Sequence, residues 1–129
     1  MDSRHVSTVI RRPASEVYAY AADPDHLPDW AAGLAEGELT REGDTLLVDS
    51  PMGRVSVRFV PPNEYGVLDH DVTLPSGTVV TNPVRVLAHP DGAEVLFTVR
   101  QIELTDAELE GDVAKVAADL ARLKAILEG

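Results

Sequence analysis

The chain contains no cysteine, so disulfide bonds, cysteine-ligated iron–sulfur clusters and thiolate nucleophiles are all excluded. It also lacks any apolar run near the ~20 residues that a membrane-spanning helix needs. The opening residues, MDSRHVSTVIRRPASEV, contain neither the uninterrupted apolar core nor the cleavage site of a secretory signal. From these absences we expect a cytoplasmic protein with no membrane span.

Basic residues are scarce as well. The formal net charge is -11, because 11 lysines and arginines stand against 22 aspartates and glutamates. A field of this sign repels phosphate backbones, so we expect no nucleic-acid partner. Hydrophobic residues make up 44% of the 129 residues, which is a globular composition at the usual size of one domain. We therefore expect residues 1–129 to form a single domain.

Signals for metals and cofactors are missing too. The four histidines, His5, His26, His70 and His89, fall on different predicted elements, and no two of them have the spacing of metal ligands on one element. The sequence has no P-loop, dinucleotide-binding fingerprint or G-x-S-x-G motif. We expect no metal and no cofactor.

The apolar pattern predicts a strand, two short helices, six strands and one long helix. Residues 4–10 alternate as a strand does, and Pro13 suits the first turn of a helix over residues 14–22. Asp25 is expected to cap a second short helix that ends at Trp30. Six β runs separated by turn residues then follow, at 37–41, 45–50, 54–60, 67–74, 78–88 and 93–104. This spacing favours an antiparallel meander.

The last segment carries the clearest helix signal. Thr105 followed by Glu108 is a capping box. One apolar stripe then recurs at steps of three and four residues: Leu109, Val113, Val116, Leu120, Leu123 and Leu127. This pattern predicts an amphipathic helix of about six turns.

This order of elements resembles the START-like superfamily, also called SRPBCC or Bet v 1-like, and its polyketide cyclase/dehydrase branch in particular. The segments RPASEVY and DPDHLPDW resemble the family opening, a Pro-Ala start and an Asp-Pro turn before a helix that ends in Trp. The resemblance implies an α+β helix-grip fold, β-α-α-β6-α, in which a curved antiparallel sheet wraps around a long C-terminal helix. It also implies a cavity for a small apolar ligand. Members range from lipid carriers to cyclases and co-chaperones, so the fold alone does not assign a function.

Two polar residues interrupt apolar rows on neighbouring strands. His70 shares a predicted strand face with Val72, and Asn82 shares one with Val80 and Val84. If the strands pair, the imidazole and the amide both enter the concave side of the sheet. Each group offers a hydrogen-bond donor and an acceptor, which suits a hydrophobe that bears a carbonyl or a hydroxyl. Alternatively, the two side chains satisfy each other inside the core.

Further candidates for ligand contact are large apolar and aromatic side chains that the pattern turns inward. These are Trp30, Tyr20, Phe59, Phe97, Val116 and Leu120. Each is also a candidate for the core, because a wall that faces a ligand has the same pattern as a wall that faces a side chain. Tyr18 is expected at the surface, and Met52 lies in a turn that can cover one end of the cavity.

The sequence leads to one main hypothesis and two alternatives. The main hypothesis is a binding protein for a small hydrophobic molecule, lipid- or polyketide-like, with His70 and Asn82 as polar anchors. The first alternative is a polyketide cyclase or dehydratase in which His70 moves a proton and Asn82 polarises a carbonyl oxygen. The second is a protein-interaction module that uses the acidic surface. A homodimer through an exposed sheet edge stays open, as does catalysis itself.

Overall fold

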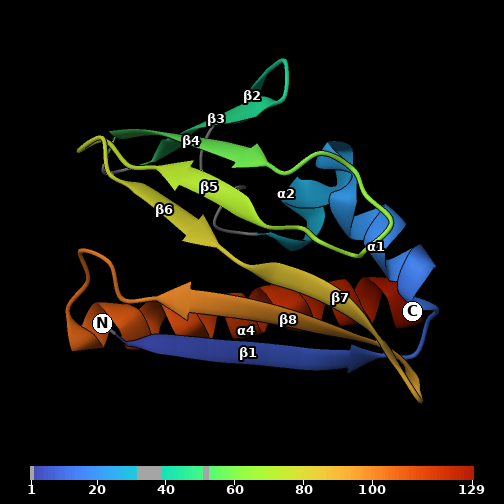
Figure 1. Ribbon diagram of the computed structural model, residues 1–129. Helices are drawn as coiled ribbons and strands as arrows, with labels where there is room; N and C mark the ends of the chain where they lie inside the picture. Colours follow the sequence, from blue (N-terminus) through green and yellow to red (C-terminus); the bar gives the residue numbers. More distant parts are fainter. Residues whose placement is uncertain (1, 32–38, 51–52) are drawn as a thin grey trace.

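The computed structural model describes residues 2–31, 39–50 and 53–129 (Figure 1). The first two residues of the predicted strand at 37–41, and Met52, lie outside the described residues. The elements are β1 (Ser3–Ile10), α1 (Ala14–Ala22), the 3-10 helix η1 (Pro24–His26), α2 (Leu27–Trp30), β2 (Leu39–Glu42), β3 (Thr45–Ser50), β4 (Gly53–Phe59), β5 (His70–Thr73), β6 (Val79–Asn82), β7 (Val84–His89), β8 (Gly92–Arg100) and α4 (Asp106–Glu128).

The predicted α+β helix-grip class is confirmed: curved antiparallel sheets surround a long C-terminal helix. One sheet has the strand order β1-β8-β7, and the other has the order β2-β3-β4-β5-β6. In Figure 1, α4 runs behind β1 and β8, and α1 lies at one end of the molecule, where it contacts β7 and β8. Among the described residues, no helix is long and apolar enough to cross a membrane.

The sheet divides at Pro83, which the sequence analysis did not predict. The run at 78–88 forms two strands, because β6 pairs with β5 in the larger sheet and β7 pairs with β8 in the smaller one. Proline has no N–H to donate to a ladder, so a strand cannot continue unchanged through it. The Pro83 carbonyl still accepts from the Thr98 N–H at 2.9 Å. Within residues 39–50 and 53–129, seven strands therefore follow the short helices, in place of the predicted six.

The helices near the N-terminus match the prediction in position but not in every detail. Helix α1 covers the predicted residues 14–22. The predicted cap Asp25 is wrong, because it is the Asp23 carboxylate that accepts, at 2.9 Å, from the Asp25 N–H. Tyr18 is also misplaced by the prediction: it packs half-buried against the core, and its hydroxyl accepts from the Asn63 N–H at 2.9 Å.

Helix α4 follows the predicted pattern closely. The capping box between Thr105 and Glu108 is present on both sides. Leu109, Leu120 and Leu123 from the predicted stripe are buried. Because the stripe recurs once per helical turn, burying it keeps one face of α4 against the smaller sheet and α2.

Candidate functional site

An inner pocket of about 180 Å³ lies between the two sheets, helix α2 and helix α4. Its walls are mostly apolar and include the rings of Trp30, Phe59 and Phe97. Three polar residues line it as well, namely His70, Asn82 and Asp119. Apolar walls with a few converging polar groups are the usual composition of a small-molecule site.

A larger outer pocket of about 750 Å³ adjoins the inner one. It extends along the β5–β6 hairpin, the end of β8 and the first half of α4. Both pockets are lined by Val72, Asn82, Phe97 and Asp119, and these four residues are called the pocket junction below. A ligand that occupies both pockets therefore passes these four residues.

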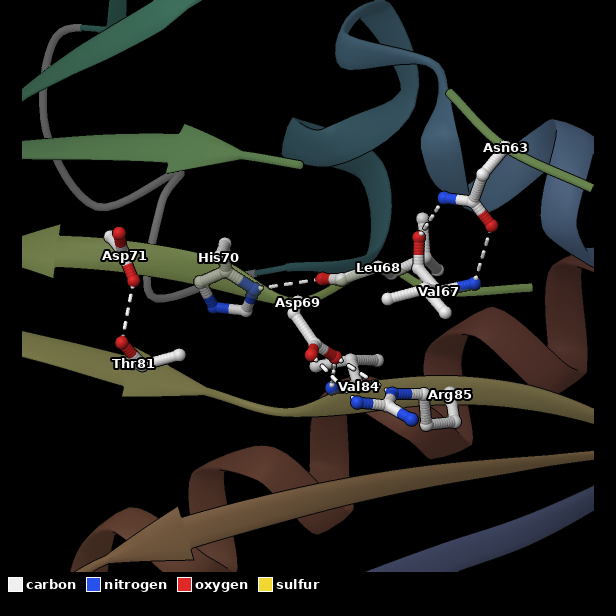
Figure 2. Close-up of polar contacts among 9 residues, drawn as sticks. All are labelled: Asn63, Val67, Leu68, Asp69, His70, Asp71, Thr81, Val84 and Arg85. Atoms are coloured by element: carbon white, nitrogen blue, oxygen red, sulfur yellow. Dashed lines mark hydrogen bonds and ion pairs between the residues drawn. The ribbon is translucent and has the colours of Figure 1, made fainter. Parts of the chain in front are cut away.

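The hydrogen bonds of His70 determine where its protons lie. Residue His70 is directly opposite Asn82 in the pairing of β5 with β6. Its Nδ1 is 3.2 Å from the Leu68 carbonyl oxygen, which can only accept, so Nδ1 carries the hydrogen (Figure 2). Nε2 is then an acceptor, and the Asn82 Nδ2 donates to it at 3.3 Å. Burial lowers the pKa of His70 below its usual value, which favours this neutral form.

Two phenylalanines flank the imidazole. The Phe59 ring centroid is 4.7 Å from that of His70, and the Phe97 ring meets His70 edge-on at 5.7 Å. Both distances lie in the range of favourable aromatic pairs. His70 therefore forms part of an aromatic wall and supplies a polar edge to it.

The residues on either side of His70 fix its strand to the neighbouring strands. The Asp69 carboxylate accepts from the Val84 N–H at 2.9 Å and from Arg85 at 2.9 and 2.8 Å (Figure 2). The hydrogen bond from Arg85 lowers the pKa of Asp69. On the other side of His70, Asp71 accepts from the Thr81 hydroxyl at 2.6 Å. These contacts join β5 to the chain before and after Pro83, and so hold His70 at the pocket.

Comparison with protein families identifies the chain. The family model described as polyketide cyclase / dehydrase and lipid transport matches residues 1–128. The chain belongs to this family. Solved structures agree on the fold of this family member. The Aha1 dimer from Colwellia psychrerythraea has a TM-score of 0.75 at 17% identity and covers 99% of this chain and 97% of its own. Protein CV1439 from Chromobacterium violaceum has a TM-score of 0.73 at 15% identity and covers 100% of this chain and 99% of its own.

A third similar structure is DynU16, a protein of the dynemicin biosynthetic locus. It has a TM-score of 0.75 at 16% identity and covers 99% of this chain. The match covers 48% of DynU16, so this family member spans about half of its length. No curated protein matches the sequence. At these identities the likeness shows the fold.

The structure brings most of the predicted site residues of this family member together. Trp30, Phe59, His70, Asn82 and Phe97 line the inner pocket. Whether they contact a ligand stays a prediction.

Three predicted residues lie elsewhere. Val116 lines the outer pocket. Leu120 borders neither pocket but a separate groove of about 420 Å³ between β1 and α4. The Tyr20 ring stacks on His26 with centroids 4.0 Å apart, and Tyr20 lines neither pocket. Tyr20 and Leu120 face inward as predicted, but they pack with the core and line neither the inner nor the outer pocket.

Asp119 is the pocket residue that the sequence analysis missed. It lies three residues after Val116 and one before Leu120, so it borders the apolar stripe of α4. Its carboxylate accepts from the Arg122 guanidinium, and the Nε of Arg122 donates to the Trp30 carbonyl at 3.3 Å. The ion pair thus fixes a carboxylate at the pocket and connects α4 to the end of α2.

Proposed function

We propose that this family member binds a small, mostly apolar molecule in the inner pocket, with His70 and Asn82 as hydrogen-bonding anchors. One observation carries the proposal: a paired imidazole and amide lie in a pocket wall that is otherwise largely apolar and aromatic. Each apolar Å² that a ligand and this wall remove from water contributes roughly 25 cal/mol. The polar pair then fixes the orientation of the ligand.

The position of Trp30 makes the proposal directly testable. Trp30 is the only tryptophan of the chain, and its ring lines the inner pocket. Binding of a ligand is therefore expected to change tryptophan fluorescence, and native mass spectrometry gives the stoichiometry. A panel of lipids, polyketides and phenolic compounds covers the expected ligand class. The proposal fails if no compound changes either signal.

Two neighbouring substitutions separate the pocket from the outside of the sheet. Asn82→Leu keeps the size of the side chain but removes the polar anchor, so the affinity for an oxygen-bearing ligand is expected to fall about tenfold. Thr81→Val is the matched control, because Thr81 is adjacent in β6 and its hydroxyl donates to Asp71 on the exposed face. The control is expected to bind as the unchanged protein does. An equal loss in both variants would show that the pocket is not involved.

The same site supports a second candidate, chemistry of the cyclase or dehydratase type. It is favoured by the family description and by a neutral His70 that shares its pocket with the Asp119 carboxylate. In this scheme His70 takes up a proton next to a substrate carbonyl, while Asn82 polarises the oxygen. Turnover of a polyketide substrate that survives in His70→Ala would eliminate it.

A further inference from the structure

We infer that the indole N–H of Trp30 donates a hydrogen bond to the ligand and makes the inner pocket selective for apolar molecules with a ketone or quinone carbonyl, over hydrocarbons and carboxylates of the same shape. The inference rests on the proposed binding function and names the chemical class of the ligand. Its starting point is that Trp30 Nε1 is buried and has no hydrogen-bond partner in the described part of the chain. Trp30 is only 6% exposed, and it lines the inner pocket.

A buried N–H without an acceptor is unusual, and its place in the fold is informative. Buried tryptophan usually finds a partner for its N–H, because the group loses its hydration on folding. Within residues 2–31, 39–50 and 53–129, only one other buried side-chain nitrogen or oxygen lacks a partner, namely Arg100 Nε, and Arg100 lines only the outer pocket. Trp30 is therefore the residue that brings an unsatisfied donor to the inner pocket. A ligand oxygen beside the ring would satisfy it.

The backbone around Trp30 keeps its ring at the pocket. Trp30 is the last residue of α2, and its carbonyl oxygen accepts from Arg122 Nε at 3.3 Å. The N–H of the next residue, Ala31, donates to the Leu27 carbonyl at 2.8 Å. These bonds connect the end of α2 to α4 and to its own first turn. The torsion between Cβ and the indole ring has a broad energy minimum, so a small rotation of the ring is enough to bring the N–H to a ligand.

Asn82, a member of the pocket junction, adds a second donor. The Nδ1–H of His70 donates to Leu68, and Nε2 accepts from one of the two N–H groups of Asn82. The second N–H of Asn82 stays available to a ligand, because no other bond of this amide nitrogen is found in the described part of the chain. Trp30 and Asn82 thus both offer an N–H in a pocket with mostly apolar walls. A carbonyl oxygen has two lone pairs, so it can accept from one of them or from both.

The charges around the pocket favour a neutral acceptor. Carboxylate oxygens accept hydrogen bonds as well, but a buried charge needs a counter-ion. Among the described residues that line the inner pocket there is no lysine and no arginine. The whole chain has a net charge of -11. A ligand carboxylate would therefore lose its hydration without gaining a cation, whereas a ketone or a quinone gains the hydrogen bond at a smaller loss.

Three compounds with the same bicyclic body test the inference on the unchanged protein. Alpha-tetralone carries a carbonyl, its exocyclic methylene analogue has CH₂ in place of the oxygen, and the corresponding tetrahydronaphthoate is an anion. The indole N–H of the single Trp30 gives one cross-peak in a ¹H–¹⁵N NMR spectrum, and its shift in a titration reports each affinity. We expect the ketone to bind at least about tenfold more tightly than the methylene analogue, which is the effect of one hydrogen bond. We also expect the ketone to move the indole proton downfield of its position with the methylene analogue, and the naphthoate to bind most weakly.

Two variants then assign the preference to one residue, with affinities measured by isothermal titration calorimetry. Trp30→Phe keeps an aromatic ring but removes the N–H, so the preference for the ketone over the methylene analogue is expected to fall by about tenfold. Phe59→Leu is the matched control, because Phe59 also lines the inner pocket with a ring but has no donor. The control is expected to weaken both compounds alike and to keep the preference.

The outcomes separate the inference from the proposed function. If the ketone and its methylene analogue bind equally, or the naphthoate binds best, the inference is overturned while the binding function stands. An unchanged preference in a folded Trp30→Phe variant also overturns it. If none of the three compounds moves the Trp30 cross-peak up to millimolar concentration, the inference is overturned as well, and the panel of lipids, polyketides and phenolic compounds decides whether the proposed function stands. The comparison on the unchanged protein decides the matter even where a variant does not fold.

Discussion

Mild acid is expected to destabilise the protein through His70. The imidazole is buried, its Nδ1–H donates to Leu68, and its Nε2 accepts from Asn82. A proton added at Nε2 would face an N–H donor and would have little water around it. Burial therefore lowers the pKa of His70 in the folded protein, while the unfolded chain titrates at about 6.5.

The sign and the size of the effect follow from these two pKa values. Between them, only the unfolded chain takes up the proton, so stability is full above about pH 6.5 and falls as the pH drops toward the folded pKa. The limiting slope for one proton is about 1.4 kcal/mol per pH unit. From about pH 7.5 to about pH 5.5, the loss of unfolding free energy is thus up to about 1.4 kcal/mol. Asp69, whose pKa is lowered, contributes stability that is lost only below about pH 3.9, outside this window.

Urea unfolding followed by Trp30 fluorescence measures this difference. The unchanged protein and His89→Asn are expected to lose the same unfolding free energy over the window. His89→Asn is the control because His89 lies at the end of β7, is not fully buried and lines neither pocket. His70→Asn cannot titrate at this position and is expected to lose much less. The reasoning is refuted if His70→Asn shows the full pH dependence.

Two further substitutions test the packing around the site. Gly111→Ala is expected to raise the unfolding free energy by about 0.5–1 kcal/mol, because Gly111 is in the interior of α4. An added Cβ there meets nothing within 4 Å. A Tm below that of the unchanged protein would contradict this prediction. Asp69→Ala is expected to lower the unfolding free energy by about 1–3 kcal/mol, because the Val84 N–H and the Arg85 guanidinium lose their acceptor. Hydrogen exchange of the Val84 amide checks the second prediction, with Asp71→Ala as the control; equal protection of Val84 in both variants would contradict it.

Most of the fold could be predicted because its signals are local. The stripe from Leu109 to Leu127 repeats once per helical turn, and the cap at Thr105 needs only four consecutive residues. The division of the sheet at Pro83 could not be found in this way, because the alternation of apolar residues continues unbroken from Val80 to Val84. Pro83 interrupts the ladder between β6 and β7, and a long-range contact then holds the start of β7. The Asp69 carboxylate replaces a strand carbonyl as the acceptor for the Val84 N–H.

The candidate site could be predicted best where a strand carries it. A strand alternates strictly, so His70 and Asn82 could be assigned to one face, and they do meet there. A helix face is broader, and its neighbours decide which of its residues reach a pocket. Leu120 and Tyr20 face inward as the pattern indicates, yet Leu120 borders a separate groove and Tyr20 stacks on His26.

Asp119 was not among the predicted site residues, although its position along α4 carries a signal. The predicted apolar stripe of α4 runs through Val116, Leu120 and Leu123, and Asp119 is not a member of it. Yet Asp119 is three residues after Val116 and four before Leu123, so it lies at the edge of this stripe. A carboxylate in such a stripe loses hydration on folding, and that loss has to be offset by a partner. Arg122, three residues further along the same helix, is that partner. The spacing of Val116, Asp119 and Arg122 along the helix is therefore a signal for the ion pair that the sequence already contains.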